Sequence, residues 1–174
     1  MRPGVSVNTA QVKVKNQNIL EFEGDAILVP TISEGLMVYG IAASVKEITG
    51  QEVEDQVLKH APLAVGAALV TEAKSMHVRF LVHSPIIEAL GLRFGIENIR
   101  RCTRAALLAT NHHQIAQLAI PGFCWEECDV PVDEIARAIL DEIRGFRGPH
   151  PTELFLVDEN PDMLEAFRDL VHSR

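Results

Sequence analysis

"DAILVP", residues 25–30, is the stretch that decides the fold. Its apolar residues follow one another without alternation and a proline closes the run, which is typical of a strand buried on both faces. Two more short apolar runs, "IAQLAIPG" at 115–122 and "TELFLVD" at 152–158, predict further strands. We therefore expect the 25–30 strand to lie inside a sheet that carries helices on both faces.

The segments around these strands supply the helices and the remaining strands. Apolar residues recur at helical spacing between Tyr39 and Thr49, and Gly50 ends the pattern. Near the end of the chain, Asn160 is a predicted N-cap and Pro161 a predicted first helical residue. Further helices are predicted at 52–60, 96–110 and 130–146, and further strands at 7–15, 67–73 and 78–84, the last ending at Pro85.

Strands and helices thus alternate along most of the chain. This order predicts an α/β protein with a mostly parallel sheet between two layers of helices. In such sheets ligands bind beyond the carboxyl ends of the strands, in the loops that follow them. The loops in question are "TISEGLMVYG" at 31–40, "SPIIEALGLRFG" at 84–95 and "PGFCWEECDVP" at 121–131.

Composition narrows the classes of function. A chain of 174 residues with 47% hydrophobic and 23% charged residues suits one folded domain, which we expect to span residues 1–174. The net charge of −8 argues against direct nucleic-acid binding, which requires a basic face. No apolar run approaches the roughly 18 residues of a membrane span, so no membrane association is expected. Three cysteines without a signal-peptide pattern indicate a reduced, cytoplasmic setting.

Several stretches, taken in order, resemble the macro domain family, whose members bind ADP-ribose or process Appr-1''-p. "YGIAASVKEITG" at 39–50 is similar to the family's glycine-rich helix start, and "NILEFEGDAILVP" at 18–30 to its entry turn and strand. "QLAIPGFCWEECDVPVDEIARAILDEI" at 117–143 resembles its phosphate loop and the following helix, with both prolines in register. The likeness runs from Val12 to Leu170 and implies a three-layer α/β/α fold with a mixed, mostly parallel central sheet.

The resemblance also implies where a ligand would bind. In the family the base lies by the first turn, the diphosphate over a helix N-terminus, and the distal ribose beside the loop after the second strand. Carried onto this sequence, the ligand-binding residues are Asn18, Ile19, Ile32, Tyr39, Gly40, Ile41, Gly122, Cys124, Trp125, Glu126 and Asp129.

Three departures from the family pattern bear on activity. Asn18 replaces the Asp that accepts the adenine amino group, a change worth on the order of 1 kcal/mol. Ile32 replaces the Asn that helps to place the distal ribose and the attacking water. Gly40 alone remains of the glycine run that lets backbone amides approach the diphosphate. We therefore expect binding without the family's hydrolysis.

The 121–131 loop departs further, because acids replace its glycines. Glu126 and Asp129 stand at the two glycine positions and Glu127 lies between them. One carboxylate about 6 Å from a phosphate charge costs roughly 3 kcal/mol at an effective dielectric of 20. Two or three such pairs would cancel a micromolar affinity of about 8 kcal/mol, unless the side chains point to solvent.

Other interpretations of this loop stay open. Cys124 and Cys128 lack the further ligands of a zinc site, so no metal or cofactor is expected. The acids suit Mg²⁺ or Ca²⁺, but a solvated acidic loop explains them as well. A thiol nucleophile at Cys124 would need a base, and His83 ends what is predicted to be a nearby strand. Trp125 either stacks on the ligand or caps the pocket.

The sequence thus supports one leading hypothesis and two alternatives. The leading one is a macro-domain-like protein that binds ADP-ribose or a related nucleotide-type small molecule through a remodelled pocket, with no catalytic residue assigned. The first alternative is a degenerate member that serves as an interaction or structural module with a protein partner. The second is an enzyme with different chemistry at Cys124 and His83.

Overall fold

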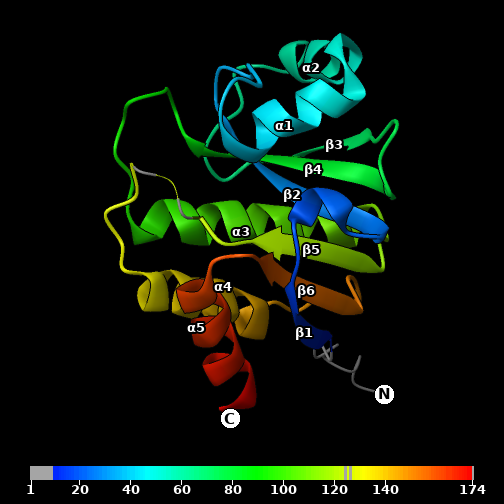
Figure 1. Cartoon of the computed structure of the whole chain (residues 1–174). Coiled ribbons are helices and arrows are strands. Elements are labelled where there is room, and N and C mark those ends of the chain that lie inside the picture. Colours follow the sequence, from blue (N-terminus) through cyan, green and yellow to red (C-terminus); the bar gives the residue numbers. More distant parts are fainter. Residues whose placement is uncertain (1–9, 124, 126, 174) are drawn as a thin grey trace, which may run out of the picture.

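The computed structural model of the protein describes residues 10–123, 125 and 127–173. A six-stranded sheet with strand order β1-β6-β5-β2-β4-β3 runs through the molecule (Figure 1). The strands are β1 (Gln11–Asn16), β2 (Gly24–Ile32), β3 (Leu69–Glu72), β4 (Val78–Ile87), β5 (Gln117–Pro121) and β6 (Glu153–Asp158). All neighbouring strands are parallel except β3, which pairs antiparallel with β4. The predicted α/β class with a mixed, mostly parallel sheet is therefore confirmed.

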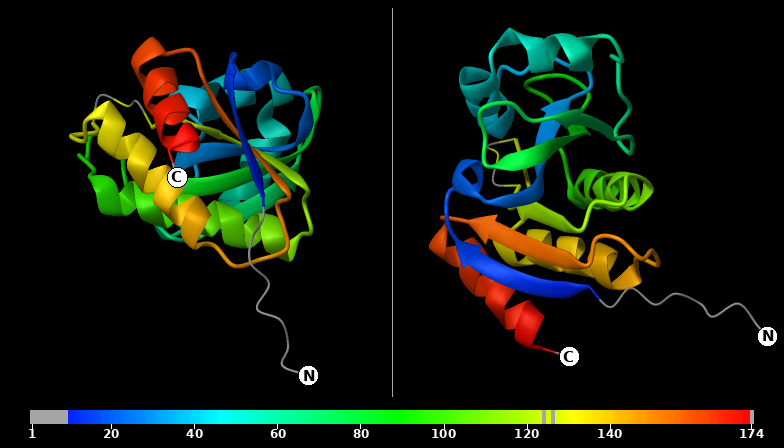
Figure 2. Two further views of the ribbon diagram at one scale, coloured as in Figure 1. Left: turned by 90° about the horizontal axis from the view of Figure 1, so that it is seen from below. Right: turned by 90° about the vertical axis from the view of Figure 1, so that its right-hand side faces the viewer.

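Helices cover both faces of this sheet (Figure 2). They are η1 (Ile19–Glu21), α1 (Gly40–Thr49), α2 (Gln51–Leu58), α3 (Ile96–His112), α4 (Val132–Gly145) and α5 (Pro161–His172). Asn160 caps α5 as predicted, since its Oδ1 accepts hydrogen bonds from the backbone N–H groups of Asp162 and Met163. No helix of the described residues is long and apolar enough to cross a membrane.

The apolar run 25–30 serves two cores at once. Ala26 and Leu28 pack in the larger core, formed with α3, α4 and α5. Ile27 and Val29 pack in the smaller one, formed with η1, α1 and α2. Because successive side chains of a strand point to opposite faces, an unbroken apolar run is what a sheet covered on both faces requires.

Two strands extend through a proline that was expected to end them. β2 continues past Pro30 to Ile32, and β4 past Pro85 to Ile87. β2 pairs with β5 only at Ala26 and Ile27, so further along it has a ladder partner on one side only. A strand tolerates proline at such an edge, because no ladder hydrogen bond is lost on the open side.

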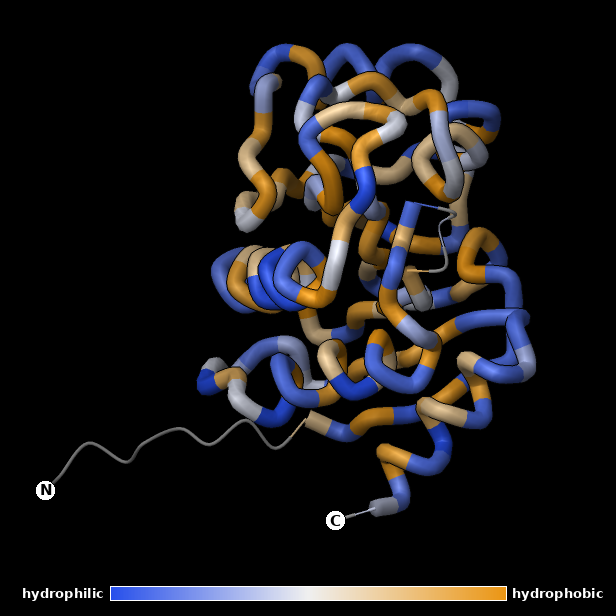
Figure 3. The backbone as a smooth tube through the Cα atoms, turned by 90° about the vertical axis from the view of Figure 1, so that its left-hand side faces the viewer, coloured by the Kyte–Doolittle hydropathy of each residue, from blue (hydrophilic) through white to orange (hydrophobic). Residues whose placement is uncertain are grey.

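The parallel strands bring five chain segments to one edge of the sheet, the carboxyl edge, which faces the viewer in Figure 3. The strands end there at Asn16, Ile32, Ile87, Pro121 and Asp158. The loop after β2 is tied down by the buried carboxylate of Glu54 in α2, which accepts a 2.8 Å hydrogen bond from the backbone N–H of Met37. The same carboxylate also pairs with Lys46 of α1, so the loop and both helices are held together.

Candidate ligand site at the carboxyl edge of the sheet

A cavity of about 160 Å³, here called the base cavity, opens at the carboxyl edge beside the ends of β1, β5 and β6. Four of the residues singled out from the sequence line it, although they come from three distant segments: Asn18, Ile19, Ile41 and Gly122. The other lining residues are Gln17, Pro121, Val157, Asp158 and Glu159. The fold thus gathers the first-turn, helix-start and loop-start parts of the predicted site.

Hydrogen-bond acceptors dominate the β1 side of the base cavity. Asn18 is the N-cap of η1, and its Oδ1 accepts a 3.0 Å hydrogen bond from the backbone N–H of Leu20. The side-chain Nε2 of Gln17 donates to the carbonyl of Glu21, which fixes the amide. Its Oε1 is buried and has no hydrogen-bond partner in the described part of the chain. A buried acceptor of this kind favours a ligand that brings an N–H donor.

Asp158 organises the opposite side. It ends β6, and its carboxylate accepts hydrogen bonds from the backbone N–H groups of Gly122 at 3.1 Å, Glu159 at 2.8 Å and Asn160 at 2.9 Å. A Cβ atom at Gly122 would lie 2.5 Å from Asp158 Oδ2 and 2.9 Å from the Met163 side chain. Only glycine therefore fits at the start of this loop.

Gln17 and Asp158 were not among the residues predicted from the sequence. Asp158 carried a usable signal, because an acid at the end of a predicted strand of a parallel sheet must lie at the carboxyl edge. Gln17 carried none. Its unpaired oxygen is a result of packing, which no local pattern of residues describes.

The N-terminus of α1, where the family resemblance places a diphosphate, lies under an aromatic side chain. Gly40 has a φ of 57° in the left-handed region, which glycine adopts without strain. The indole Nε1 of Trp125 would be 3.5 Å from a Cβ atom at Gly40. Trp125 also makes edge-to-face contacts with Tyr39, at 4.8 Å between ring centroids, and with Phe94, at 6.0 Å. The three rings form what we call the aromatic cluster.

The described part of the 121–131 loop is anchored to the loop after β4. The backbone N–H of Phe94 donates to the carbonyl of Glu127 at 3.0 Å, and that of Asp129 donates to the carbonyl of Phe94 at 3.3 Å. The Arg93 guanidinium pairs with the Asp129 carboxylate through its Nε and Nη2. These hydrogen bonds lower the pKa of the Asp129 carboxyl below its ordinary value.

Pairing with Arg93 changes the electrostatics expected of this loop. The Asp129 carboxylate is neutralised by a neighbouring guanidinium and is not left to repel a phosphate. Glu127 has one carboxylate oxygen, Oε2, that is buried without a hydrogen-bond partner in the described part of the chain. Cys124 and Glu126, also predicted as site residues, lie outside the described residues.

Ile32 and His83 lie in the interior of the protein. Ile32 is 3% exposed and packs in the larger core. His83 is fully buried within β4, with Nε2 2.9 Å from the hydroxyl oxygen of Thr71. Burial lowers the pKa of His83 to about 4, so the ring is neutral at pH 7. His83 therefore lies within a strand and not at its end, where the thiol-enzyme hypothesis expected it.

The described cysteines have the properties of packed thiols. Burial raises the pKa of Cys102 to about 12, and its Sγ donates to the carbonyl of Ser84. Burial also raises the pKa of the Cys128 thiol. A thiol with a raised pKa carries little thiolate at pH 7 and is a weak nucleophile. Among residues 10–123, 125 and 127–173, no group of three or more His, Cys, Asp or Glu side chains is placed to hold a metal ion.

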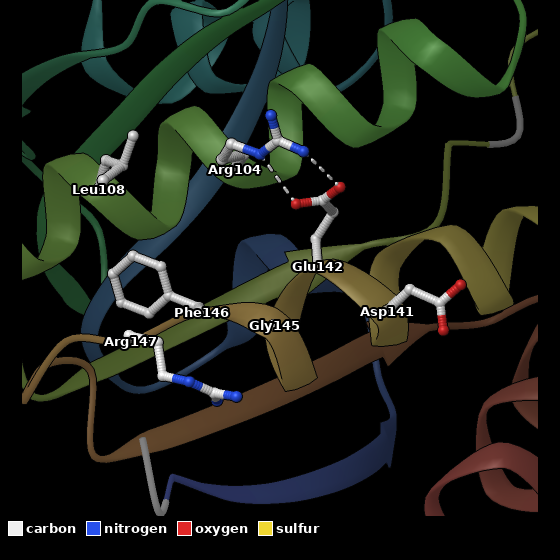
Figure 4. A pocket seen from close by; sticks show the side chains of 7 residues that line it. All are labelled: Arg104, Leu108, Asp141, Glu142, Gly145, Phe146 and Arg147. Carbon is white, nitrogen blue, oxygen red and sulfur yellow. Dashed lines mark hydrogen bonds and ion pairs between the residues drawn. The ribbon is translucent and has the colours of Figure 1, made fainter. Parts of the chain in front are cut away.

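A larger cavity, of about 570 Å³, lies between α3 and α4, away from the carboxyl edge (Figure 4). Arg104 donates two hydrogen bonds, of 3.0 and 2.9 Å, to the Glu142 carboxylate across it. Because the charges of Arg104 and Glu142 already pair with each other, this larger cavity offers little to a charged ligand. We regard the smaller base cavity as the better candidate for the predicted ligand, because Asn18, Ile19, Ile41 and Gly122 of the predicted site line it.

Comparison with known proteins decides the family. The sequence model of the Macro domain matches residues 30–139. The chain belongs to the macro domain family. A protein of Aquifex aeolicus is 33% identical, over 94% of this chain and 99% of its own length. A protein of Aeropyrum pernix is 28% identical, over 88% of this chain and 79% of its own length.

Solved macrodomains share the fold at low sequence identity. The Trypanosoma brucei macrodomain in complex with ADP-ribose is 15% identical and superposes with a TM-score of 0.80, over 92% of this chain and 69% of that one. A mutant Oceanobacillus iheyensis macrodomain with ADPR is 17% identical, with a TM-score of 0.76 over 97% of this chain and 95% of that one. The three-layer macrodomain architecture expected from the sequence is therefore confirmed.

Proposed function

We propose that the protein binds ADP-ribose or a related nucleotide-type small molecule at the carboxyl edge, with the base in the base cavity. One observation carries this proposal. Asn18, Ile41 and Gly122, which the family resemblance assigns to the ligand, line a single cavity together with Gln17, whose buried Oε1 has no hydrogen-bond partner in the described part of the chain. The amino group of an adenine is the kind of donor that such an acceptor lacks.

The size of the cavity limits how much of the ligand it holds. A site for a drug-sized ligand occupies about 300–1,000 Å³, whereas the base cavity measures about 160 Å³. It accommodates a base and not a whole ADP-ribose. The remaining groups would pass over Gly40, where the Trp125 ring now lies. We therefore expect the base and its ribose to supply most of the affinity and the diphosphate to add little.

The proposal includes the loss of the family's hydrolytic activity. The residue that would place the attacking water is Ile32, which carries no hydrogen-bonding side chain and is buried in the larger core. His83 does not replace it, because the ring is fully buried and is held by Thr71. Incubation with Appr-1''-p should then release no phosphate above the level of a buffer blank.

Calorimetric titration with ADP-ribose, ADP, AMP and adenosine tests the binding proposal. We expect heat with a Kd below about 100 µM for at least one of them, and affinities within about tenfold for AMP and ADP-ribose. In parallel, amide resonances of Asn18, Ile41 and Gly122 should shift in two-dimensional NMR spectra. Flat titrations for all four compounds would remove the nucleotide proposal.

An interaction module is the second candidate function, and a different observation favours it. Four large apolar side chains are exposed on the loops after β2 and β4: Leu36, Val38, Leu90 and Leu92. Exposed apolar side chains at neighbouring loops are typical of surfaces that meet a protein partner. Sedimentation over a hundredfold range of concentration tests self-association. A strictly monomeric protein whose L90S/L92S variant behaves identically would count against this candidate.

We place the protein in the cytoplasm. Cys102 and Cys128 are both free thiols, as a reducing compartment would keep them. Fractionation of cells that express a tagged full-length chain would test this location.

A further inference from the structure

A groove separate from the base cavity runs along α3, and we call it the α3 groove. Its larger part, about 610 Å³, lies between Arg101 of α3, segment 62–65, Ser33 and Glu34 after β2, and Glu88 after β4. A smaller part of about 230 Å³ continues along α3 to Leu108. The two parts share Val65 and Arg101, so they form one continuous surface. The α3 groove has no lining residue in common with the base cavity.

Backbone hydrogen bonds fix the walls of this groove. The N–H of Leu63 donates to the carbonyl of Ser33 at 2.9 Å, and the N–H of Ser33 donates to the carbonyl of Ile87 at 3.0 Å. Further along, the Ser84 hydroxyl donates to the carbonyl of Ala67 at 2.8 Å, which holds the segment against β4. The groove is therefore preformed, and a ligand would not have to order its walls.

Ser33 points to a ligand in the larger part of the groove. The residue is only 8% exposed, and its Oγ is buried without a hydrogen-bond partner in the described part of the chain. A buried hydroxyl without a partner is unfavourable, and a ligand that supplies a partner removes this cost. Since the backbone N–H and carbonyl of Ser33 are both hydrogen-bonded, this lining residue of the groove is held in place.

Three charged side chains in the larger part of the α3 groove are also unpaired within the described ranges, in contrast to Arg100 and to Arg104, which lines the smaller part. Arg100 pairs with Asp141, and Arg104 forms two hydrogen bonds with Glu142. Arg101, Glu34 and Glu88 are exposed and make no ion pair with any described residue. The larger part of the groove is thus lined by two carboxylates, those of Glu34 and Glu88, by the guanidinium of Arg101, and by the apolar side chains of segment 62–65.

We propose that the α3 groove binds an extended peptide segment with one basic and one acidic side chain. The ammonium or guanidinium group of the peptide lies at Glu34, Glu88 and Ser33, and its carboxylate lies at Arg101. Its apolar side chains lie on Leu63 and Val65. From Arg101 to Leu108 the helix rises about 10 Å, roughly three residues of an extended chain, and the larger part of the groove adds further length. This site does not depend on the nucleotide proposal.

Amide chemical shifts of the full-length protein test the proposal with defined probes. The first probe is a terminally blocked tetrapeptide of lysine, alanine, leucine and glutamate, and the second has the reverse order. The third is the uncharged analogue with glutamine at both charged positions. We expect one of the charged peptides to shift the amides of Ser33, Leu63 and Arg101 with a Kd below about 1 mM, and the uncharged analogue to bind at least about tenfold more weakly.

Two variants with the same change of charge provide the control. Arg101→Gln should weaken binding of the charged peptide at least about fivefold, since it removes the partner of the peptide carboxylate. Arg100→Gln alters the same helix but faces α4, and it should leave the affinity unchanged. The proposal is overturned if no peptide shifts these amides, if the uncharged analogue binds equally well, or if both variants behave alike.

Discussion

The two ends of the carboxyl edge differ in which groups they offer to a ligand. At the end formed by β1, β5 and β6, the base cavity keeps an unpaired acceptor on Gln17 and an acceptor oxygen on Asn18. At the end formed by β2 and β4, the aromatic cluster covers Gly40, and Arg93 fastens the loop at Asp129. One end thus has acceptor oxygens that suit the proposed base, whereas at the other end packed rings lie over the start of α1.

Under the proposed function, this difference separates the binding of the base from the binding of the diphosphate. The acceptors described at the base end are side-chain oxygens of Gln17 and Asn18, two residues that lie between β1 and η1 and are held by hydrogen bonds to the backbone of η1. The diphosphate end depends on glycines that leave the backbone uncovered, and a single bulky residue can cover it. A chain that binds the diphosphate weakly could therefore still bind the base, as the proposed function expects.

The largest effect that tests this comparison is expected at Gly122. Gly122→Ala would force a methyl group to 2.5 Å from Asp158 Oδ2 and against Met163. Overpacking of this kind should lower the free energy of unfolding by about 2–3 kcal/mol and distort the base cavity. Chemical denaturation measures the change. Gly145→Ala, where no atom lies within 4 Å of the new Cβ, is the matched control and should not destabilise.

A second test uses pH and the buried histidine inside β4, His83. The pKa of His83 in the folded protein is about 4, against about 6.5 for an unfolded chain, so only the unfolded state takes up a proton between these values. Folding stability should then fall by about 2 kcal/mol as the pH decreases from 6.5 to 5. Urea unfolding at several pH values gives this slope. A His83→Gln variant with an undiminished slope would show that other groups cause it.

The third test opens the diphosphate end. Trp125→Ala removes the ring above Gly40 and exposes the N-terminus of α1, which attracts anions. The affinity for ADP-ribose relative to AMP should rise about tenfold, or about 1.4 kcal/mol. Parallel titrations of both ligands measure this ratio. If both affinities fell together, the indole would be a stacking surface for the base, and the comparison drawn above would fail.

The smallest effect concerns the base itself. Asn18→Asp keeps the N-cap of η1 and supplies a charged acceptor, so adenine nucleotides should bind about fivefold more tightly, by roughly 1 kcal/mol. Inosine nucleotides lack the amino group and serve as the matched ligand control. An equal gain for both ligands would place Asn18 away from the amino group.

Much of the fold could be predicted because periodicity and end signals are local. The unbroken run at 25–30 indicated a doubly covered strand, and Asn160 with Pro161 indicated the start of α5. Strand ends are less predictable, since the sequence predicts stops at Pro30 and Pro85 whereas β2 runs on to Ile32 and β4 to Ile87. Whether a proline interrupts a strand depends on which neighbour lies beside it, and that information is not local.

The candidate site also has features that the sequence predicts and features that it does not. Asn18, Ile41 and Gly122 were found through the resemblance, which preserves the order of strand ends and loops. The sequence did not indicate that Trp125 would lie against Gly40, or that Asp129 would turn to Arg93. Both contacts join loops that have no repeating pattern, and their geometry depends on how two loops pack together.

The unequal layers around the sheet have a consequence for motion. The layer of α1 and α2 contains two short helices of ten and eight residues over the smaller core, whereas α3, α4 and α5 cover the larger one. Local opening takes least free energy where few apolar contacts are lost, so amide hydrogens of α1 should exchange with deuterium before those of β2 or β6. The base cavity lies between α1, where fast exchange is expected, and β6, where slow exchange is expected. Ile41 of α1 and Asp158 of β6 both line it. A bound nucleotide would contact both α1 and the end of β6. Its binding should therefore slow the exchange of amide hydrogens in α1.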